Sequence, residues 1–412
     1  MDLLLKGCHI IDATTPEVRR DAYVLIQDDT IASVGSGALP TAERILDLEG
    51  AYLLPGLWDV HTHLRPSTWL GWEPPQAPAE AILQHGQCAM DALQAGVTAL
   101  RVVGIQDWAD VAWRHAFNTG ACVGPRLFCC GYGLRTTAGH SASLSGTTSM
   151  LTHVDGPEAM IKAVRTQIKH GVDQIKLVTT GGIMGTGHDV MSAVMFLREE
   201  LDAAMRIARQ RGKAVAVHAT AAEAVTWAVQ AGAHSIEHGY LLDEEAVALM
   251  VKHGVYYVPT LALSHLTQDQ AGTPFEHTYC HQHVLPEVFR ERANTFAPAH
   301  EASFRLALEA GVKIASGSDQ GPPQEAALLE IEFLARCGLG SYGAIVAATL
   351  TAAEVCQAAE RLGSVEVGKL ADLIVVADNP LEDIHHLRRL QMVLKGGEVV
   401  VDHTRRNACG HP

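Results

Sequence analysis

The sequence lacks four features that would each point to a particular class of protein. It has no uninterrupted apolar run of the roughly 18 residues that a membrane-spanning helix needs, and its N-terminal apolar stretch is too short for a signal peptide. Basic residues are not in excess: the formal net charge of −15 argues against nucleic acid or an anionic membrane as a partner. The nine cysteines show no Cys-x-x-Cys spacing and no disulfide framework, which is typical of a reducing compartment. We therefore expect a soluble, cytoplasmic protein.

Several catalytic signatures are also missing. No Gly-x-Ser-x-Gly elbow for a covalent nucleophile is present. The glycine-rich stretch GGIMGTGHD (181–189) lacks the spacing of a dinucleotide-binding or phosphate-binding loop. The composition is otherwise that of a globular protein, with 48% hydrophobic and 19% charged residues. Histidine, with 22 residues, is unusually frequent.

The chain changes texture along its length. Residues 1–56 and 365–412 are short apolar runs broken by Gly, Asp and Pro, which predicts one composite β-sandwich domain built from both ends. Between them, residues 57–364 alternate β-like runs with amphipathic helical patterns, which indicates βαβ units of the α/β class. Eight strands with helical intervals predict a (β/α)8 TIM barrel. The predicted strands are 53–63, 97–103, 125–131, 173–182, 214–219, 234–239, 255–261 and 312–319.

Histidine, lysine and aspartate side chains stand in or at the end of five of these predicted strands. In LLPGLWDVHTHLRP (53–66), His61 and His63 are two apart, so in a strand both side chains point to the same side. Paired imidazoles suit a metal ion. Lys176, His218, His238 and Asp319 stand in or at the end of four other predicted strands. Each histidine alone is more typical of a core or surface residue, but active sites of barrels lie at the strand carboxyl ends, so the set favours a metal site.

In order along the chain, the motifs PGLWDVHTH, QIKLVTTGG, VAVHA, IEHG, ASGSDQG and GKLADLIVV resemble those of the binuclear amidohydrolase superfamily. The similarity is greatest to its prolidase, Xaa-amino-acid carboxypeptidase and imidazolonepropionase-like members, including ochratoxin-type amidases. The resemblance implies two divalent metal ions, with zinc expected and manganese or cobalt as alternatives. The implied roles are His61 and His63 on the more buried metal, a carbamate of Lys176 bridging both, His218 and His238 on the outer metal, and Asp319 completing the site.

The chemistry of Lys176 agrees with that assignment. A lysine ammonium, with an ordinary pKa of about 10.4, is repelled by divalent cations and is a poor ligand. Addition of CO2 to the neutral amine produces an anionic carbamate that can hold two cations. The plainer alternative for Lys176 is a structural ion pair.

Two cations about 3.5–4 Å apart share a water and lower its pKa to near 7, which supplies a bridging hydroxide. Asp319 is the expected proton shuttle to the leaving amine. We therefore expect a metal-dependent hydrolase that cleaves the amide C–N bond of a dipeptide or N-acyl amino acid, as an amidase, dipeptidase or carboxypeptidase. The alternatives are a lactonase, esterase or phosphotriesterase, a cyclic amide hydrolase, and a catalytically inactive barrel that serves as a binding module.

Substrate contacts are expected from two loops. The stretch GYGLRTTAGHSASLSG (131–146) carries His140, which resembles a substrate-binding Gly-His element of the prolidase-like group and is a candidate for catalysis and for binding a carboxylate, and also Arg135. Trp69 and Trp72 are candidate apolar walls. The plainer alternatives are a solvated histidine, a surface arginine, and tryptophans at a packing or oligomer contact.

One departure from the family bears on the substrate. Some relatives carry a carboxylate-binding tyrosine in the helix after the fifth predicted strand. The corresponding stretch here, HATAAEAVTWAVQAG (218–232), has none, which argues against strict dipeptidase specificity and admits a bulkier or more apolar N-acyl amino acid. The expected partner is thus a small molecule bearing a carboxylate. The family resemblance also implies a homo-oligomer.

Two further histidine pairs, His-x-His at 281–283 and His-His at 385–386, are not expected to bind metal. The first lies in 264–299, which we expect to be an irregular lid that becomes helical from about Val284.

Overall fold

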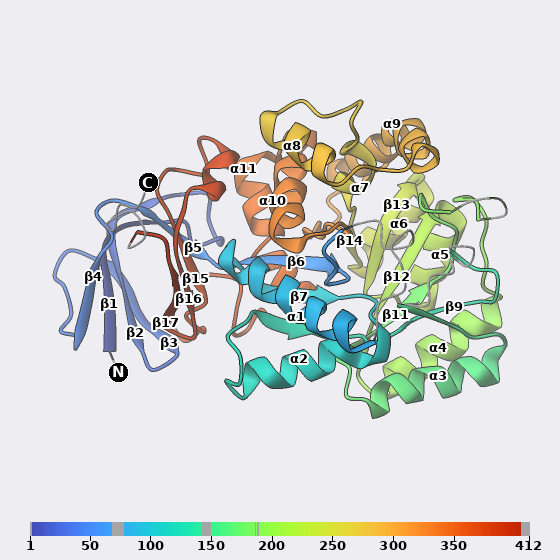
Figure 1. Ribbon diagram of the computed structural model, residues 1–412, viewed down its shortest axis with the longest axis horizontal. Helices are drawn as coiled ribbons and strands as arrows, with labels where there is room; N and C mark the ends of the chain where they lie inside the picture. Colours follow the sequence, from blue (N-terminus) through green and yellow to red (C-terminus); the bar gives the residue numbers. More distant parts are fainter. Residues whose placement is uncertain (1, 68–77, 142–149, 186, 188, 405–412) are drawn as a thin grey trace.

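The computed structural model describes residues 2–67, 78–141, 150–185, 187 and 189–404, and it places a β-sheet beside a larger part made of strands and helices (Figure 1). Within these residues, no helix combines the length and the apolar character that crossing a membrane requires. The chain is therefore a mixed α/β protein with a separate sheet, in agreement with the predicted class.

Both ends of the chain build one sheet. Its eight strands run in the order β17-β16-β15-β5-β1-β2-β3, with β4 paired to β1. β15 lies antiparallel to β5, with Leu373 opposite Pro55, so the C-terminal strands join the N-terminal ones directly. Apolar side chains of β1, β2, β5 and β15 pack in a cluster of their own. The division at residues 56 and 365 stays a prediction. The strands are β1 (Asp2–Ile10), β2 (Arg19–Gln27), β3 (Thr30–Ser36), β4 (Arg44–Asp47), β5 (Tyr52–Pro55), β15 (Leu373–Val376), β16 (Leu390–Lys395) and β17 (Glu398–Asp402).

The larger part holds two parallel sheets, β6-β7-β8 and β10-β9-β11-β12-β13-β14. Strands β6, β7, β9 and β11 are buried at every residue, as is typical when helices cover a parallel sheet. The strands are β6 (Leu57–Thr62), β7 (Val97–Val102), β8 (Arg126–Phe128), β9 (Gly133–Arg135), β10 (Leu151–His153), β11 (Gln174–Val178), β12 (Ala214–Ala221), β13 (Ser235–Leu241) and β14 (Tyr256–Val258).

Backbone hydrogen bonds connect these two sheets on both sides. The Ala315 amide donates to Tyr257 of β14, and the Val60 amide of β6 donates to Ser316. On the opposite side, the carbonyl oxygen of Cys129, just after β8, accepts from the amides of Asp173 and Gln174 at the start of β11. The segment 313–316 thus lies between β14 and β6.

The predicted strand 312–319 was wrong in extent. Only a single bridge between Ile314 and Tyr257 represents it. Beyond it the chain leaves the extended conformation, because Asp319 adopts a left-handed φ of 51°. This turn decides where the Asp319 carboxylate lies.

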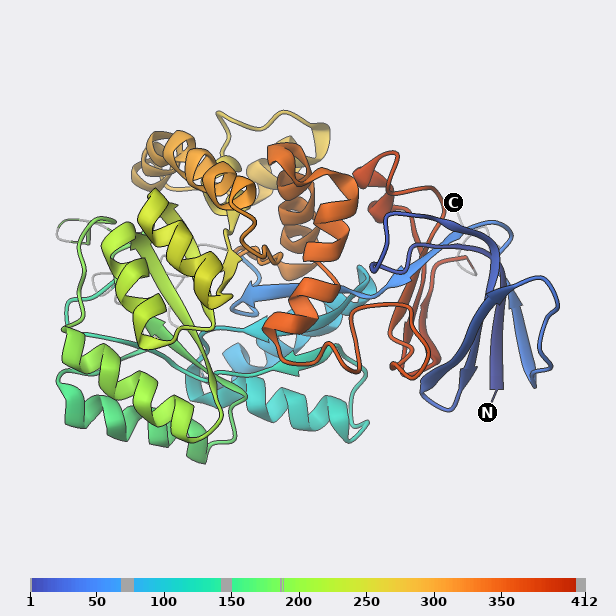
Figure 2. The same cartoon turned by 180° about the vertical axis from the view of Figure 1, so that it is seen from behind.

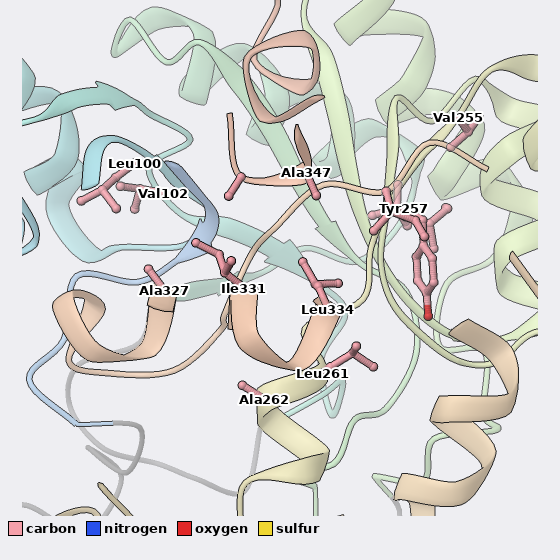
Figure 3. Packing of buried hydrophobic residues seen from close by; sticks show 14 of the residues in the cluster. Leu100, Val102, Val255, Tyr257, Leu261, Ala262, Ala327, Ile331, Leu334 and Ala347 are labelled. Atoms are coloured by element: carbon pink, nitrogen blue, oxygen red, sulfur yellow. The ribbon is translucent and has the colours of Figure 1, made fainter. Parts of the chain in front are cut away.

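Helices alternate with the parallel strands and cover their outer side (Figure 2). Figure 3 shows Ile331 and Leu334 of α10 in the same buried cluster as Tyr257 and Leu261. The helices are α1 (Pro78–Gln94), α2 (Ala109–Asn118), α3 (Pro157–Lys169), α4 (Arg198–Gln210), α5 (Ala222–Ala231), α6 (Glu244–His253), α7 (Leu261–His265), α8 (Pro274–Gln282), α9 (Glu287–Glu309), α10 (Pro323–Leu334), α11 (Gly340–Ala347) and α12 (Leu350–Val355).

The expectation of an irregular segment from 264 to 283 was wrong, because α8 lies within it. Thr273 accepts from the Glu276 amide, Glu276 reaches back to the Thr273 amide, and Pro274 occupies the first turn, which together start a helix. Helix α9 begins at Glu287 rather than near Val284. The pair at 281–283 falls at the end of α8, and the pair at 385–386 lies in a 3-10 turn over Ile384–Arg388.

Candidate metal centre

Three of the predicted ligands converge at the carboxyl end of β6. His63 Nε2 lies 3.1 Å from Asp319 Oδ1, and His61 Nε2 lies 3.8 Å from the same oxygen. The ligand atoms of these three residues are all within 4.8 Å of one another. In the described part of the chain they are the one group of histidine, cysteine or carboxylate side chains spaced for a metal ion.

Local interactions bring Asp319 against β6. Asp59 Oδ1 accepts from the backbone amides of His61 and Ser318 at 3.0 Å each, so one buried carboxylate joins the two segments. Gly317 allows the close approach, because a Cβ at this position would lie 2.6 Å from His61 Cβ. The Asp319 amide then donates to the His61 carbonyl at 2.7 Å. Burial alone would raise the pKa of Asp319, but His61 and His63 hold it well below its ordinary value.

His61 of β6 and His63, just after this strand, both have their Nδ1 in a hydrogen bond. His61 donates Nδ1–H to Glu237 at 2.8 Å, and His63 donates Nδ1–H to the Gly104 carbonyl at 2.8 Å. Arg101 donates to both Glu237 oxygens at 2.8 Å. Each imidazole is therefore left with its Nε2 lone pair facing Asp319, which is how a partner fixes the tautomer of a metal-binding histidine.

Charge and burial set the ionisation of Glu237 and His61. Burial would raise the pKa of Glu237, but Arg101 and His61 hold it well below its ordinary value. Burial, and then the charge of Lys176, lower the pKa of His61 to about 4. A neutral imidazole beside a carboxylate is the form a cation needs.

His218 and His238 lie next to this group. Their rings are 4.4 Å apart between centroids, and His238 is 4.8 Å from His61. His218 donates Nε2–H to the Gly181 carbonyl at 3.1 Å, which leaves Nδ1 as the acceptor. Thr260 donates its own hydroxyl to Pro259, so His238 donates Nδ1–H to Thr260 at 2.8 Å and keeps a lone pair on Nε2.

His238 has an uncommon backbone. Its φ is +74°, a left-handed conformation that costs free energy for a non-glycine residue. Its carbonyl accepts from Tyr257 Oη at 2.8 Å and from His300 Nε2 at 3.0 Å, and these bonds hold the conformation.

Lys176 stands on β11 with its amine inside this cluster. Its side chain is 3% exposed, and its Nζ has no hydrogen-bond partner among the described residues. Burial lowers its pKa to about 8. A buried amine with no partner does not fit a structural ion pair, whereas it fits a site where another group binds to the nitrogen.

The predicted substrate residues are placed differently from one another. His140 is buried, with its ring 4.8 Å from that of His218 between centroids. Arg135 ends β9, and its guanidinium donates to the His140 carbonyl. Arg135 thus supports the loop that carries His140. Trp69 and Trp72 lie outside the described residues.

Sequence reasoning missed four polar residues around this centre: Glu237, Arg101, Asp189 and Arg65. Alternation in a strand predicts that Glu237 and His238 face opposite sides, but the left-handed backbone of His238 allows both to face the centre. The position of Glu237 directly before a predicted ligand was an available signal. Arg65 donates from its guanidinium to the Asp319 carbonyl at 3.2 Å and lies 3.5 Å from its carboxylate, a contact that no local pattern indicates.

Comparison with known proteins agrees with this geometry. Residues 52–400 match the amidohydrolase family. Ochratoxinase from Aspergillus niger is 30% identical over 93% of this chain and 83% of the relative. The structure of a Xaa-Pro dipeptidase with methionine bound in its active site superposes with a TM-score of 0.85 at 32% identity, covering 97% of this chain and 100% of that one. A prolidase complexed with N-methylphosphonate-L-proline gives a TM-score of 0.87 at 28% identity, covering 98% and 100%.

Proposed function

We propose that this chain, which belongs to the amidohydrolase family, uses two divalent metal ions to cleave the amide C–N bond of an N-acyl amino acid or dipeptide. The single observation that carries the proposal is the arrangement of four histidines. In each, one ring N–H donates to a protein acceptor and the other ring nitrogen keeps its lone pair. They surround a buried lysine amine without a partner among the described residues. Such a set has no use in a purely structural core.

The donors present fit a binuclear centre. His61 and His63 would hold one ion, His218 and His238 the other, with Asp319 at the first and Lys176 between them. The pKa of Lys176, lowered to about 8 by burial, leaves an appreciable fraction of neutral amine near neutral pH, which is the form that adds CO2 to become a carbamate. When bound, zinc or a similar ion would lower the pKa of water and polarise the substrate carbonyl.

The protein's own residues would then handle the protons and the substrate. The Asp319 carboxylate faces Nε2 of His61 and of His63, so it can accept the proton of the attacking water and pass it to the leaving amine. An amide nitrogen leaves poorly unless it is protonated. His140, beside His218, would bind an oxygen of the substrate.

The backbone links between the two parallel sheets support a closed (β/α)8 barrel, in which segment 313–316 takes the place of the eighth strand. Active sites of this fold lie at the carboxyl ends of the strands. His61 stands near the carboxyl end of β6, while His218 and His238 stand at or just beyond the middle of β12 and β13.

The proposed substrate class rests on the names of the relatives and on the lack of a tyrosine in the helix after β12. One relative is named for ochratoxin, one solved structure is a Xaa-Pro dipeptidase with bound methionine, and another is a prolidase with N-methylphosphonate-L-proline. The helix after β12 has no tyrosine for a substrate carboxylate, since Ala222–Ala231 reads AEAVTWAVQA. We therefore favour an N-acyl amino acid with a bulky apolar acyl group over a small dipeptide.

The test is a library assay on protein stripped with a chelator and reloaded with zinc, manganese or cobalt. We expect N-acyl amino acids to be cleaved only by the loaded protein, and Lys176→Ala to abolish both turnover and binding of the second metal equivalent. Lactones, esters, a phosphotriester and a cyclic amide are assayed beside them. Faster turnover of one of those classes would replace the amidase proposal, and a metal content below one equivalent per chain would refute the metal centre.

A further inference from the structure

His140 is held by a carboxylate that lies outside the proposed metal ligands. Its Nδ1 is 3.0 and 3.1 Å from the two oxygens of Asp189, which comes from the loop after β11. The Asp189 carboxylate is 1% exposed, and the His140 side chain is 11% exposed. Because a carboxylate accepts, the ring must carry its proton on Nδ1, and Nε2 has no hydrogen-bond partner in the part of the chain that the structure describes.

Asp189 is itself fixed by the glycine-rich loop. It accepts from the Ser141 amide at 2.7 Å and from the Gly182 amide at 3.1 Å. Burial would raise its pKa, but His140 and these amides lower it, so the group is ionised. The carboxylate thus joins the loop that follows β9 to the loop that follows β11.

The glycines of that loop make room for this pair. A Cβ at Gly182 would lie 2.5 Å from His140 Cε1 and 2.7 Å from its Nε2. A Cβ at Gly185 would lie 2.2 Å from the Asp189 carboxyl carbon. Side chains at either position would displace the histidine or the carboxylate, so the glycine-rich sequence serves close packing around this pair rather than binding of a phosphate.

Helix α9 holds the same loop from the other side. Arg292 donates to the Gly182 carbonyl at 2.8 Å and to the Asp189 carbonyl at 3.3 Å. The position of His140 therefore depends on the loop after β9, the loop after β11 and helix α9. Together they restrain the ring and its distance from His218.

We propose that Asp189 is a positioning residue that fixes His140 with its proton on Nδ1 and its Nε2 directed at the substrate, an inference that rests on the proposed function. A neutral His140 presents a lone pair at Nε2, and a protonated one presents an N–H. In both forms the Nδ1–H is donated to Asp189. Without Asp189 the ring can rotate or move its proton to Nε2, and the substrate-facing atom is no longer defined. A carboxylate that merely supported the loop would act through the Ser141 and Gly182 amides alone.

A double-mutant cycle on the zinc-loaded protein separates these two roles. We expect His140→Gln to lower kcat/KM about 100-fold or more and Asp189→Asn to lower it about 10- to 100-fold. In the His140→Gln background, Asp189→Asn should change kcat/KM by less than about twofold, because the residues act as a unit. Asp155→Asn is the matched control: Asp155 accepts from the Thr137 amide of the same loop at 2.8 Å but faces solvent, and it should leave kcat/KM unchanged.

A second measurement does not depend on activity. In 15N-histidine-labelled, zinc-loaded protein, the His140 ring signals are those that disappear in His140→Gln. We expect a proton on Nδ1 in the wild type and its transfer to Nε2 in Asp189→Asn, with the zinc content unchanged.

If Asp189→Asn does not fold, Gly182→Ala tests the same contact and should lower kcat/KM. Gly272→Ala is the control, because a Cβ at Gly272 would lie 3.7 Å from its nearest neighbouring atom, and it should leave kcat/KM unchanged.

The outcomes distinguish the two proposals. If none of the amides is cleaved, the proposed function fails, and the tautomer measurement still decides the role of Asp189. If amides are cleaved but the two substitutions are additive, or if the wild-type ring carries no proton on Nδ1, the positioning role is overturned while the proposed function stands.

Discussion

Replacement of Glu237 by glutamine tests the charged residues that contact the candidate metal centre. Glu237 is fully buried and accepts two hydrogen bonds from Arg101 and one from Nδ1–H of His61. A glutamine has one acceptor oxygen and one donor NH2. If the oxygen faces Arg101, the NH2 meets His61 Nδ1 and pushes the ring proton to Nε2. If the oxygen faces His61, the NH2 opposes the guanidinium.

The magnitudes follow from burial. The substitution leaves Arg101, which is 1% exposed, as a buried charge without its partner, a change that costs about 3–5 kcal/mol of unfolding free energy. Loss of the group that orients a ligand histidine lowers metal affinity about 10- to 100-fold. We expect both effects in Glu237→Gln, measured by denaturant unfolding of the metal-free protein and by zinc competition with a chelating dye.

Asp372→Asn is the matched control. Asp372 is buried and accepts from Arg126 at 2.6 and 2.9 Å, but it lies at the start of β15, remote from the histidines. It should lower stability and leave zinc affinity at the wild-type value. Wild-type zinc affinity in Glu237→Gln, or an equal loss in Asp372→Asn, would refute the reasoning.

Two further predictions concern the backbone around the candidate centre, and a third concerns the buried carboxyl of Glu330. Gly317→Ala should lower stability by about 1–3 kcal/mol and reduce zinc binding in a calorimetric titration, while Gly272→Ala should do neither; unchanged zinc binding would contradict the close-approach argument. Tyr257→Phe removes a donor to the left-handed His238, so thermal unfolding should show a loss of about 1–2 kcal/mol and metal analysis a weaker second equivalent. Burial raises the pKa of Glu330 to about 8, so its contribution to stability is full below its ordinary pKa of 4.5 and is lost as the pH rises through 8. Unfolding free energies from pH 5 to 9 should fall more steeply for the wild type than for Glu330→Gln, and parallel curves would exclude this shift.

Much of the candidate site can be predicted from local pattern. The apolar run before His61 and His63 defines a strand, and the two-residue period then puts both rings on one side. His218 likewise follows a run of β-forming residues in β12. These inferences need only neighbours in the chain, which is why they are accessible without coordinates. The family resemblance, carried by the same motifs, is confirmed by the match over residues 52–400.

Helix α8 was accessible in principle but was missed. Its start signals, Thr273, Pro274 and Glu276, are local in the sequence. The segment was nevertheless expected to be an irregular lid rather than a helix. The truncated eighth strand was less accessible, because the left-handed turn at Asp319 is stabilised by the His61 carbonyl, far away in the sequence.

The sequence by itself determined which residues could supply a metal centre and which strands carry them, because the apolar runs that define the strands are local. It did not set where those strands end, since β12 and β13 continue three residues past His218 and His238. Only the tertiary structure decided which partner fixes each tautomer. The contacts of Glu237 with His61 and of Asp189 with His140 join residues 176 and 49 positions apart. No local pattern encodes such pairings, since they depend on how separate strands and loops pack around a buried volume.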